Sequence, residues 1–510
     1  MNANTLTESG TRAGRREWIG LAVLALPTLL LSIDMSVLYL ALPHLAADLQ
    51  PSSSQLLWIM DIYGFMVAGF LVTMGTLGDR IGRRRLLLIG ATAFGVASVL
   101  AAYSTSAEML IATRTLLGIA GATLMPSTLA LISNMFKDPR QRGTAIAVWI
   151  SCFMGGTALG PVVGGIMLHW FWWGSVFLLG VPVMVLLLAT APVLLPEYRD
   201  ENAGRLDLSS VALSLATILP VIYGLKELAK ADAIAIPLVA IAVGGAVGVV
   251  FVRRQLRLAD PLLDLRLFRN RAFRAALTTM LIGAFFMGGL FLFVSQYLQL
   301  VSGLSPLNAG LWLVPASLGM IGSTMLAPRL AQRFGVWPII TGGMVLAAVG
   351  MAVLTQAGVS ETPLLVFFGL LLAMLGLGPG AALVTDIVVG SAPPEKAGSA
   401  ASMSETSGEF GIAMGVALLG SLGTAIYRSQ VAVPEGTSAD VAAAVNDGLP
   451  SAVVAAADVP GDLGHQLLDG AREAFTNGLN VVAGIGAVAI LLFVVVLIRM
   501  IRLPQPGDRQ

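Results

Sequence analysis

The stretch from Trp58 to Arg85 reads WIMDIYGFMVAGFLVTMGTLGDRIGRRR and decides how the chain folds. Its first part is apolar over a length that can cross a bilayer, which takes about 20 helical residues at a rise of about 1.5 Å each. Asp61 lies inside this apolar part, where an ionised side chain costs roughly 2.5–3.5 kcal/mol on insertion scales. The end, from Asp79 to Arg85, is strongly basic, as the cytoplasmic end of a span usually is. The stretch therefore predicts a transmembrane helix that holds an ionisable group and ends in a charged turn.

The composition excludes a soluble globule. Of 510 residues, 56% are hydrophobic and 12% are charged, against about 25% charged in soluble domains. Three His and one Cys exclude a multi-cysteine zinc site and an internal disulfide, and no Lys follows a Gly as in a P-loop. We expect a bilayer protein without cofactor, metal or nucleic-acid partner, and no nucleophile–base pair that would indicate an enzyme.

Fourteen apolar segments of spanning length predict an all-α polytopic protein. Most of the 30 Lys and Arg residues fall on one side if both termini are cytoplasmic, and an error of one span would spoil this asymmetry. The expected spans are about 18–43, 53–78, 86–104, 108–133, 143–167, 174–195, 208–226, 233–252, 273–299, 307–330, 337–357, 363–386, 403–427 and 475–500.

A weak internal repeat predicts a duplicated architecture. The turn after the second span reads DRIGRRR, and the turn after the tenth reads PRLAQRFG, with Arg333 and Gly335 matching Arg80 and Gly82. Paired halves of this kind are typical of transporter folds. We therefore divide the chain into a six-helix half at 1–195, two extra spans with a cytoplasmic linker at 196–272, and a second six-helix half at 273–510.

Two loops are unusual. Residues 253–272 are basic and contain DPLLDLRLF, which favours an amphipathic cytoplasmic helix or, equally, a solvated linker anchored by a few Leu side chains. Residues 428–474 form a long acidic outside loop, with helical patterns at 438–446 and 462–474. An acidic hairpin could attract cations, but a solvated face is the better interpretation.

Ionisable residues inside the spans are the candidate functional groups. Asp34 and Asp61 each lie about 13 Å from the outer end of adjacent antiparallel helices, and Arg114 lies about 9 Å from the outer end of its span, where it can neutralise one of them. We expect these three residues to couple protons, and Asp61 also to contact substrate. Cross-helix hydrogen bonding without a transport role is the alternative.

Glu405 and Glu409 share one face of the thirteenth span because they are four residues apart. Carboxylates facing a cavity can exchange a proton between the two sides of the membrane or hold a cationic substrate by charge. For Glu405, a place in a hydrated vestibule is an equally good interpretation. Apolar or aromatic contacts to substrate are expected from Tyr63, Trp149, Phe285, Phe286 and Met287.

The fifth span contains GTALGPVVGG, whose small residues allow close helix packing and whose Pro bends the helix. We expect a tightly packed, kinked contact formed by Gly156, Gly160, Pro161, Gly164 and Gly165.

Four stretches together resemble the major facilitator superfamily and, within it, the fourteen-span drug:proton antiporters. GTLGDRIGRRR resembles the signature loop of the superfamily, RTLLGIAGA its fourth-span motif, GTALGPVVGG its antiporter motif and IDMSVLYLALP the first-span motif of the antiporter group. Nearly the whole chain fits in order and topology. The resemblance implies proton-driven export of lipophilic cations, such as quaternary ammonium compounds and dyes, by a monomer in a bacterial plasma membrane. It also implies a cytoplasmic gate formed by Gly75, Gly78, Asp79, Arg80, Gly82, Arg83 and Arg84.

Three positions depart from that group. No acid occurs in the tenth span, near Met320, Ser404 replaces an additional Glu beside Glu405, and Gly180 replaces an Asn. The first two losses put recognition of divalent cations in doubt. Export of a single natural product, and a polytopic sensor or lipid-handling protein, remain alternative functions.

Overall fold

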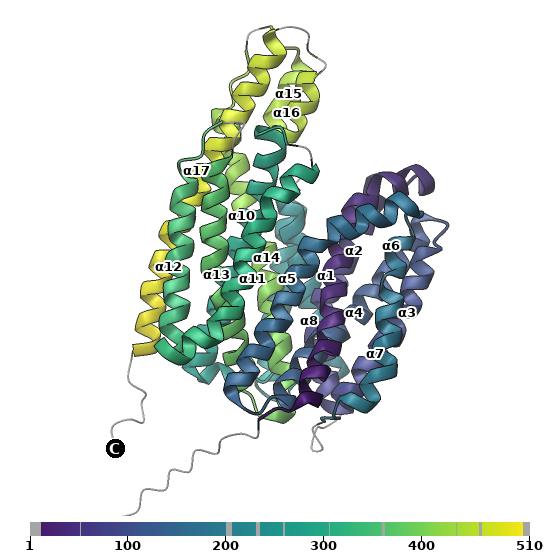
Figure 1. The fold of residues 1–510 in the computed structure, drawn as a ribbon. Coiled ribbons are helices and arrows are strands. Elements are labelled where there is room, and N and C mark those ends of the chain that lie inside the picture. Colours follow the sequence, from purple (N-terminus) through teal and green to yellow (C-terminus); the bar gives the residue numbers. More distant parts are fainter. Residues whose placement is uncertain are drawn as a thin grey trace, which may run out of the picture.

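The computed structural model describes residues 12–51, 53–199, 207–230, 235–258, 261–304, 306–359, 363–434, 436–457, 459 and 462–502. These residues form helices and no strand (Figure 1). The first seven helices are α1 (Arg15–Leu49), α2 (Ser53–Ile81), α3 (Arg83–Ala102), α4 (Ala107–Met135), α5 (Pro139–Trp170), α6 (Ser175–Leu178) and α7 (Gly180–Leu194). We call this group the N-terminal bundle.

A second group, the C-terminal bundle, begins after two further helices, α8 (Leu208–Lys230) and α9 (Ala235–Gln255). It comprises α10 (Arg271–Gln296), α11 (Pro306–Phe334), α12 (Val336–Leu354), α13 (Leu364–Gly390), α14 (Ala397–Gln430), α15 (Ala439–Asp447), α16 (Leu449–Ala457) and α17 (Asp462–Arg502). Short turns at Leu265–Arg269, Tyr297–Val301 and Pro394–Lys396 complete the described elements.

The helices confirm the expected class of protein. Thirteen described helices are long and apolar enough to span a bilayer, or fourteen when the two parts of α5 are counted as one span. These two parts, Pro139–Thr157 and Val162–Trp170, meet at an angle of 46°. The bend falls within the stretch where the sequence predicts a kink.

The two bundles meet at the end of the molecule where α1 begins and α17 ends, which we call the base (Figure 1). Buried apolar side chains gather into two large cores, one mainly from α1–α7 and the other mainly from α10–α17. Away from the base, the ribbons of the two bundles diverge. This arrangement concentrates the described polar contacts between bundles near the base.

Helix α8 packs between the bundles, and α9 packs on α8. Phe65 and Ala68 of α2 form a small buried cluster with Ile222 of α8, and Phe410 of α14 packs against it. Only 17% of the most apolar part of α9 is buried. This helix therefore presents most of its apolar surface outward. The extra spans therefore cover one seam between the bundles and do not form a separate core.

Two turn glycines support the internal duplication. Gly82, between α2 and α3, has φ = 110°, and Gly335, between α11 and α12, has φ = 88°. Backbone of this kind favours glycine because a Cβ atom would be strained there. The matched pair seen in the sequence thus marks the same sharp reversal in each bundle.

The two unusual loops differ in part from expectation. Helix α9 ends at Gln255, and the described part of the linker has only the turn Leu265–Arg269, so no long amphipathic helix forms there. Leu262 is 2% exposed and anchors the linker, as the alternative interpretation predicted. The acidic 428–474 segment forms α15, α16 and the first part of α17, and Val445, Leu449 and Leu467 are buried in the C-terminal core. It is therefore a packed helical extension, more than a solvated face.

Candidate functional site

A buried ion pair in the N-terminal bundle joins α1 to α4. Arg114 Nη1 lies 3.3 Å from Asp34 Oδ2, and the Arg114 Nε donates to the Ile59 carbonyl of α2 at 3.0 Å. The Arg114 side chain is 2% exposed and Asp34 is 9% exposed. The expectation that Arg114 neutralises one of two carboxylates is confirmed for Asp34. The side chain of Asp61 lies outside the described residues.

Tyr63 of α2 completes this cluster, although the sequence suggested it as a substrate contact. The guanidinium carbon of Arg114 lies 5.0 Å from the centre of the Tyr63 ring, and Tyr63 is 2% exposed. One ring face is therefore already occupied by a protein cation. At most the other ring face is open to a substrate, and contact of Tyr63 with substrate stays a prediction.

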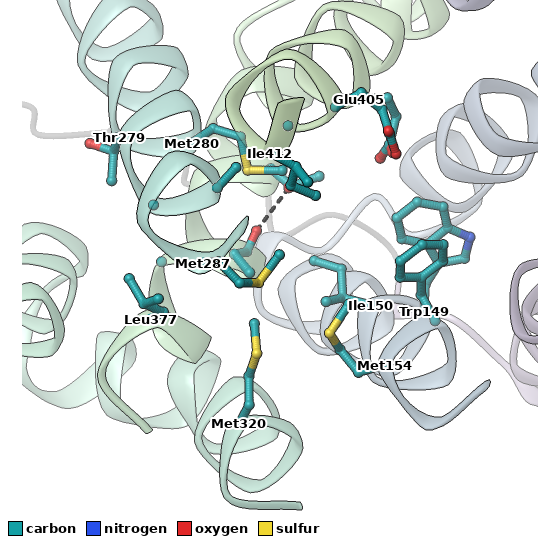
Figure 2. Close-up of a pocket in the computed structure, with 18 of the residues that line it drawn as sticks. Trp149, Ile150, Met154, Thr279, Met280, Met287, Met320, Leu377, Glu405 and Ile412 are labelled. Atoms are coloured by element: carbon teal, nitrogen blue, oxygen red, sulfur yellow. Dashed lines mark hydrogen bonds between the residues drawn. The ribbon is translucent and has the colours of Figure 1, made fainter. Parts of the chain in front are cut away.

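A cavity of about 130 Å³ lies between the bundles (Figure 2). In Figure 2 the thioethers of Met154, Met287 and Met320 point into the same space from α5, α10 and α11. Met125, Met280 and Met344 also line it. Methionine is flexible and polarisable, so such a lining can adapt to ligands of different shape. Among these methionines, the sequence indicated only Met287 as a substrate contact. The high total of 21 Met residues was the one feature of the sequence that could have indicated a methionine-lined cavity.

Trp149 lines this cavity, as the sequence predicted, and is held by a hydrogen bond from its Nε1 to the Thr128 hydroxyl at 3.1 Å. Phe285 and Phe286 are not among the lining residues. They contact each other edge to face at 5.0 Å, and Phe286 packs toward Gly486 of α17. They do not face this cavity, whereas their neighbour Met287 on α10 does, and their contact with substrate stays a prediction.

Glu405 and Glu409 both line the cavity from α14. In the described part of the chain, Glu405 forms no ion pair with Lys or Arg. Two carboxylates in a predominantly apolar space give a site where a cation is strongly favoured. The structure therefore places Glu405 with Glu409 and the methionines, and not in a separate vestibule.

Two of the three departures from the antiporter pattern lie at this cavity or next to a residue that lines it, whereas Gly180 lies elsewhere, against Phe94 and Ser98. Met320 occupies its wall where an acid would add a third carboxylate. Ser404 is fully buried on α14, and its hydroxyl has no hydrogen-bond partner among the described residues. The site thus has two described carboxylates facing one cavity, which suits one positive charge better than two well-separated ones.

Asp79 joins the two bundles at the base. Its carboxylate accepts hydrogen bonds from the backbone N–H groups of Gly398 at 3.2 Å and Ser399 at 2.9 Å, at the N-terminus of α14. It also forms an ion pair with Arg83. Free N–H groups and the helix dipole both favour a negative charge there. Asp79 therefore caps α14 and pairs with Arg83 at the same time.

The glycines of the signature loop allow α2 to approach the N-terminus of α14 closely, where Asp79 binds it. A Cβ on Gly75 would collide with the Ser402 hydroxyl, and one on Gly78 would lie 2.6 Å from Arg83 Nη1. Gly82 provides the reversal into α3, and Arg84 donates to the carbonyls of Pro192 and Leu195. Arg80 is half-buried at the end of α2. The expected gate residues therefore gather at one place on the base.

Two further contacts at the base were not expected from the sequence. Arg142 Nε lies 2.6 Å from Asp386 Oδ1, which links α5 to α13 across the bundles. Glu197 accepts from the backbone N–H groups of Arg84 and Arg85 and so caps α3. An acid at the expected inner end of the twelfth span was the available signal for Asp386, but its partner is 244 residues away.

The antiporter motif packs α5 against α1. A Cβ on Gly156 would collide with the Leu29 carbonyl and the Ser32 hydroxyl of α1, whereas nothing lies within 4 Å of the corresponding position on Gly165. Gly160 and Gly164 are buried, and the side chain of Pro161 lies outside the described residues. Gly156 thus fixes the approach of the helix that carries Asp34.

Comparison with known proteins gives consistent similarities over the chain. Residues 24–416 match the Major Facilitator Superfamily. The chain is 44% identical over 485 residues to the multidrug efflux pump LfrA of Mycolicibacterium smegmatis, covering 95% of this chain and 96% of that protein. It is 34% identical over 483 residues to the methyl viologen resistance protein SmvA of Salmonella typhimurium, with coverage of 94% and 97%.

More distant similarities include an antibiotic exporter and a solved structure. The tetracenomycin C resistance and export protein of Streptomyces glaucescens is 32% identical over 519 residues, covering 98% of this chain and 94% of that protein. The crystal structure of the human organic anion transporter MFSD10 superimposes with a TM-score of 0.62 at 16% identity, covering 94% and 99% of the two chains. At that identity, the structural likeness shows the fold alone.

Proposed function

The chain belongs to the major facilitator superfamily and to its multidrug efflux pumps, and on that premise we propose that it is a proton-coupled antiporter exporting lipophilic organic cations. The observation that carries the proposal is the cavity between the bundles, where Glu405 and Glu409 face a wall of methionines and Trp149. The apolar wall favours a lipophilic body, and the carboxylates favour a positive charge on it. The relative SmvA is named for resistance to methyl viologen, a divalent organic cation, which supports the compound class, whereas the two described carboxylates here suit a single positive charge.

The Asp34–Arg114 pair supports proton coupling. A carboxylate that is almost fully removed from water can exchange its charge state only when its surroundings change. Protonation of Asp34 would release Arg114 from this pair, and export would then be tied to proton entry by linkage. In this scheme Asp34 couples the proton, and Glu409 and Glu405 hold the cation.

The base contacts support alternating access. We infer that the base faces the cytoplasm because the basic residues of the chain gather there and basic loops stay cytoplasmic. The cap on α14 by Asp79 and the Arg142–Asp386 pair hold that side closed. The cavity of about 130 Å³ is smaller than the roughly 300–1,000 Å³ typical of drug sites, so a drug-sized cation needs movement of the bundles or the methionines.

Ethidium transport in inverted bacterial membrane vesicles tests the proposal. Uptake should require an imposed proton gradient, should stop when an uncoupler is added and should not respond to ATP once the gradient is clamped. Asp34→Asn should abolish uptake, whereas Trp170→Ala, at a side chain that is 74% exposed, is the control for general damage. Uptake that persists without a gradient would contradict the proposal.

Export of a single natural product is the second candidate function. Relatives named for resistance to tetracenomycin C and puromycin, each 32% identical to this chain, favour it. A panel of cationic and neutral compounds that compete with ethidium distinguishes the two functions. Competition by several unrelated cations supports multidrug export, and competition by one compound alone supports a dedicated exporter.

A further inference from the structure

A second, much smaller cavity lies beside the first. It has a volume of about 10 Å³ and is lined by Leu31, Tyr63, Gly64, Val67, Gly121, Met125, Phe153 and Glu409. Met125, Phe153 and Glu409 line both cavities. Glu409 of α14 is therefore the carboxylate shared by the candidate cation site and a space that belongs mainly to the N-terminal bundle.

The Tyr63 hydroxyl reaches this small cavity. It lies 3.2 Å from the position that a Cβ on Gly121 would occupy, and Gly121 is also a lining residue. Tyr63 is 2% exposed, and its hydroxyl opens onto the small cavity, since it is not among the fully enclosed polar atoms that lack a partner. A hydroxyl in such a space is stabilised when a group or a water in the cavity accepts its hydrogen bond.

The other end of the same side chain contacts the ion pair. The Tyr63 ring lies against Arg114, which holds Asp34. One residue of α2 thus contacts the charged cluster of α1 and α4 through its ring and shares a cavity with the carboxylate of α14 through its hydroxyl.

We propose that Tyr63 couples Glu409 to the Asp34–Arg114 pair, by donating a hydrogen bond to the Glu409 carboxylate directly or through one water. This inference rests on the proposed proton-coupled function and deepens it. A volume of about 10 Å³ is close to the minimum that one water needs. Tyr63 is a positioning residue here. Its hydroxyl interacts with the charge of Glu409, and its ring contacts the guanidinium of Arg114.

The charged groups around Tyr63 determine whether loss of the Asp34 charge stabilises or destabilises ionised Glu409. Asp34 faces it from α1, Arg114 from α4, and Glu409 from α14 with Glu405 one turn away; on α2 itself, the Asp61 side chain lies outside the described residues. When Asp34 loses its charge, Arg114 is left uncompensated and polarises the Tyr63 hydroxyl into a stronger donor. Ionised Glu409 is then stabilised, so protons on Asp34 and on Glu409 disfavour each other, and loss of the Asp34 charge moves the pH midpoint of cation binding downward.

A double-mutant cycle on purified protein tests this coupling. Ethidium affinity is measured from pH 5 to pH 9 in wild type, Asp34→Asn, Tyr63→Phe and the double variant. Tyr63→Phe keeps the ring over Arg114 and removes only the hydroxyl. Asp34→Asn should move the pH midpoint of binding downward by about 0.5 unit, or roughly threefold in proton affinity, in the wild-type background. In the Tyr63→Phe background the same substitution should move it by less than about 0.2 unit.

Equal shifts in both backgrounds would overturn the role of Tyr63, because a through-space field from Asp34 persists without the hydroxyl. A flat pH dependence in wild type would instead contradict the proposed proton coupling, so the two failures are distinct. If Asp34→Asn does not fold, the protons released on ethidium binding are counted in wild type and Tyr63→Phe; an equal count overturns the proposal. Tyr223→Phe, a half-buried tyrosine of α8, is the matched control.

Discussion

Replacing Asp79 by Asn tests whether the base contact controls the conformation of the protein. Asp79 accepts from two backbone N–H groups of α14 and pairs with Arg83. Arg83 belongs to the same bundle as Asp79, but its guanidinium lies against Gly398 of α14, so Asp79→Asn also leaves a buried charge unpaired in the base-closed conformation. The contact with α14 crosses between bundles and exists only when the base is closed. Asp79→Asn should therefore favour opening of the base.

The size of the effect follows from what Asn retains. Its side-chain oxygen can still accept from one N–H group, but the negative charge at the N-terminus of α14 is lost. Hydrogen bonds to charged groups contribute about 1.5–3 kcal/mol, and a charge at a helix N-terminus contributes about 0.3–1 kcal/mol, rising to about 2 when partly buried. We expect a loss of about 2 kcal/mol, which shifts the equilibrium between the two conformations roughly 30-fold.

A disulfide across the base measures this shift. A Cβ on Gly143 of α5 would lie 3.6 Å from the Cβ of Pro328 on α11, close to the mean separation of about 3.8 Å in disulfides. The pair Gly143→Cys and Pro328→Cys, with Cys152→Ser to remove the native thiol, should cross-link in membranes under mild oxidation. Adding Asp79→Asn should lower the initial cross-linking rate by at least about threefold.

The matched control is Asp138→Asn. Asp138 also lies at the base, but its carboxylate caps α5 through Arg140 N at 2.9 Å, entirely within the N-terminal bundle. It should leave the cross-linking rate unchanged. Equal rates with and without Asp79→Asn would refute the reasoning, and Asp79 would then serve only the local structure of its own loop.

Three further predictions follow from local geometry. Gly156→Ala should destabilise the purified protein by about 1–3 kcal/mol and lower transport because the methyl group meets α1, whereas Gly165→Ala should have little effect on thermal unfolding or export. Trp149→Ala should weaken ethidium binding about 2- to 30-fold while a neutral competitor loses less, with Trp170→Ala as control; an equal loss for all ligands would indicate misfolding. Hydrogen bonds and charge from Arg254 lower the pKa of Asp207 from 3.8 to about 2, so its ionised form stabilises the fold above pH 4; the Tm advantage of wild type over Asp207→Asn should shrink as pH falls from 4 to 2.

Much of the architecture could be predicted from the sequence because the bilayer restricts the choices. Apolar length sets the spans, and the sidedness of Arg and Lys fixes their number. The matched reversals at Gly82 and Gly335 were visible because each needs a conformation that favours glycine. Ionisable residues inside spans are costly, so Asp34, Arg114, Glu405 and Glu409 could be recognised as candidates from type and position alone.

Orientation and partners were decided only by the tertiary structure. A helix wheel does not say that Phe285 and Phe286 pack into the C-terminal bundle while Met287 faces the cavity, because both faces of a buried helix are apolar. The hairpin of α15 and α16 packs onto α17 through small apolar side chains that look like those of a solvated acidic loop. The pairs Arg142–Asp386 and Asp79–Ser399 join residues that are 244 and 320 positions apart, and no local pattern specifies such a partner. The sequence thus determined which ionisable groups the membrane must accommodate. Packing of the two bundles determined which of these groups meet, because charge pairing across the bundles depends on distances that only the folded chain sets.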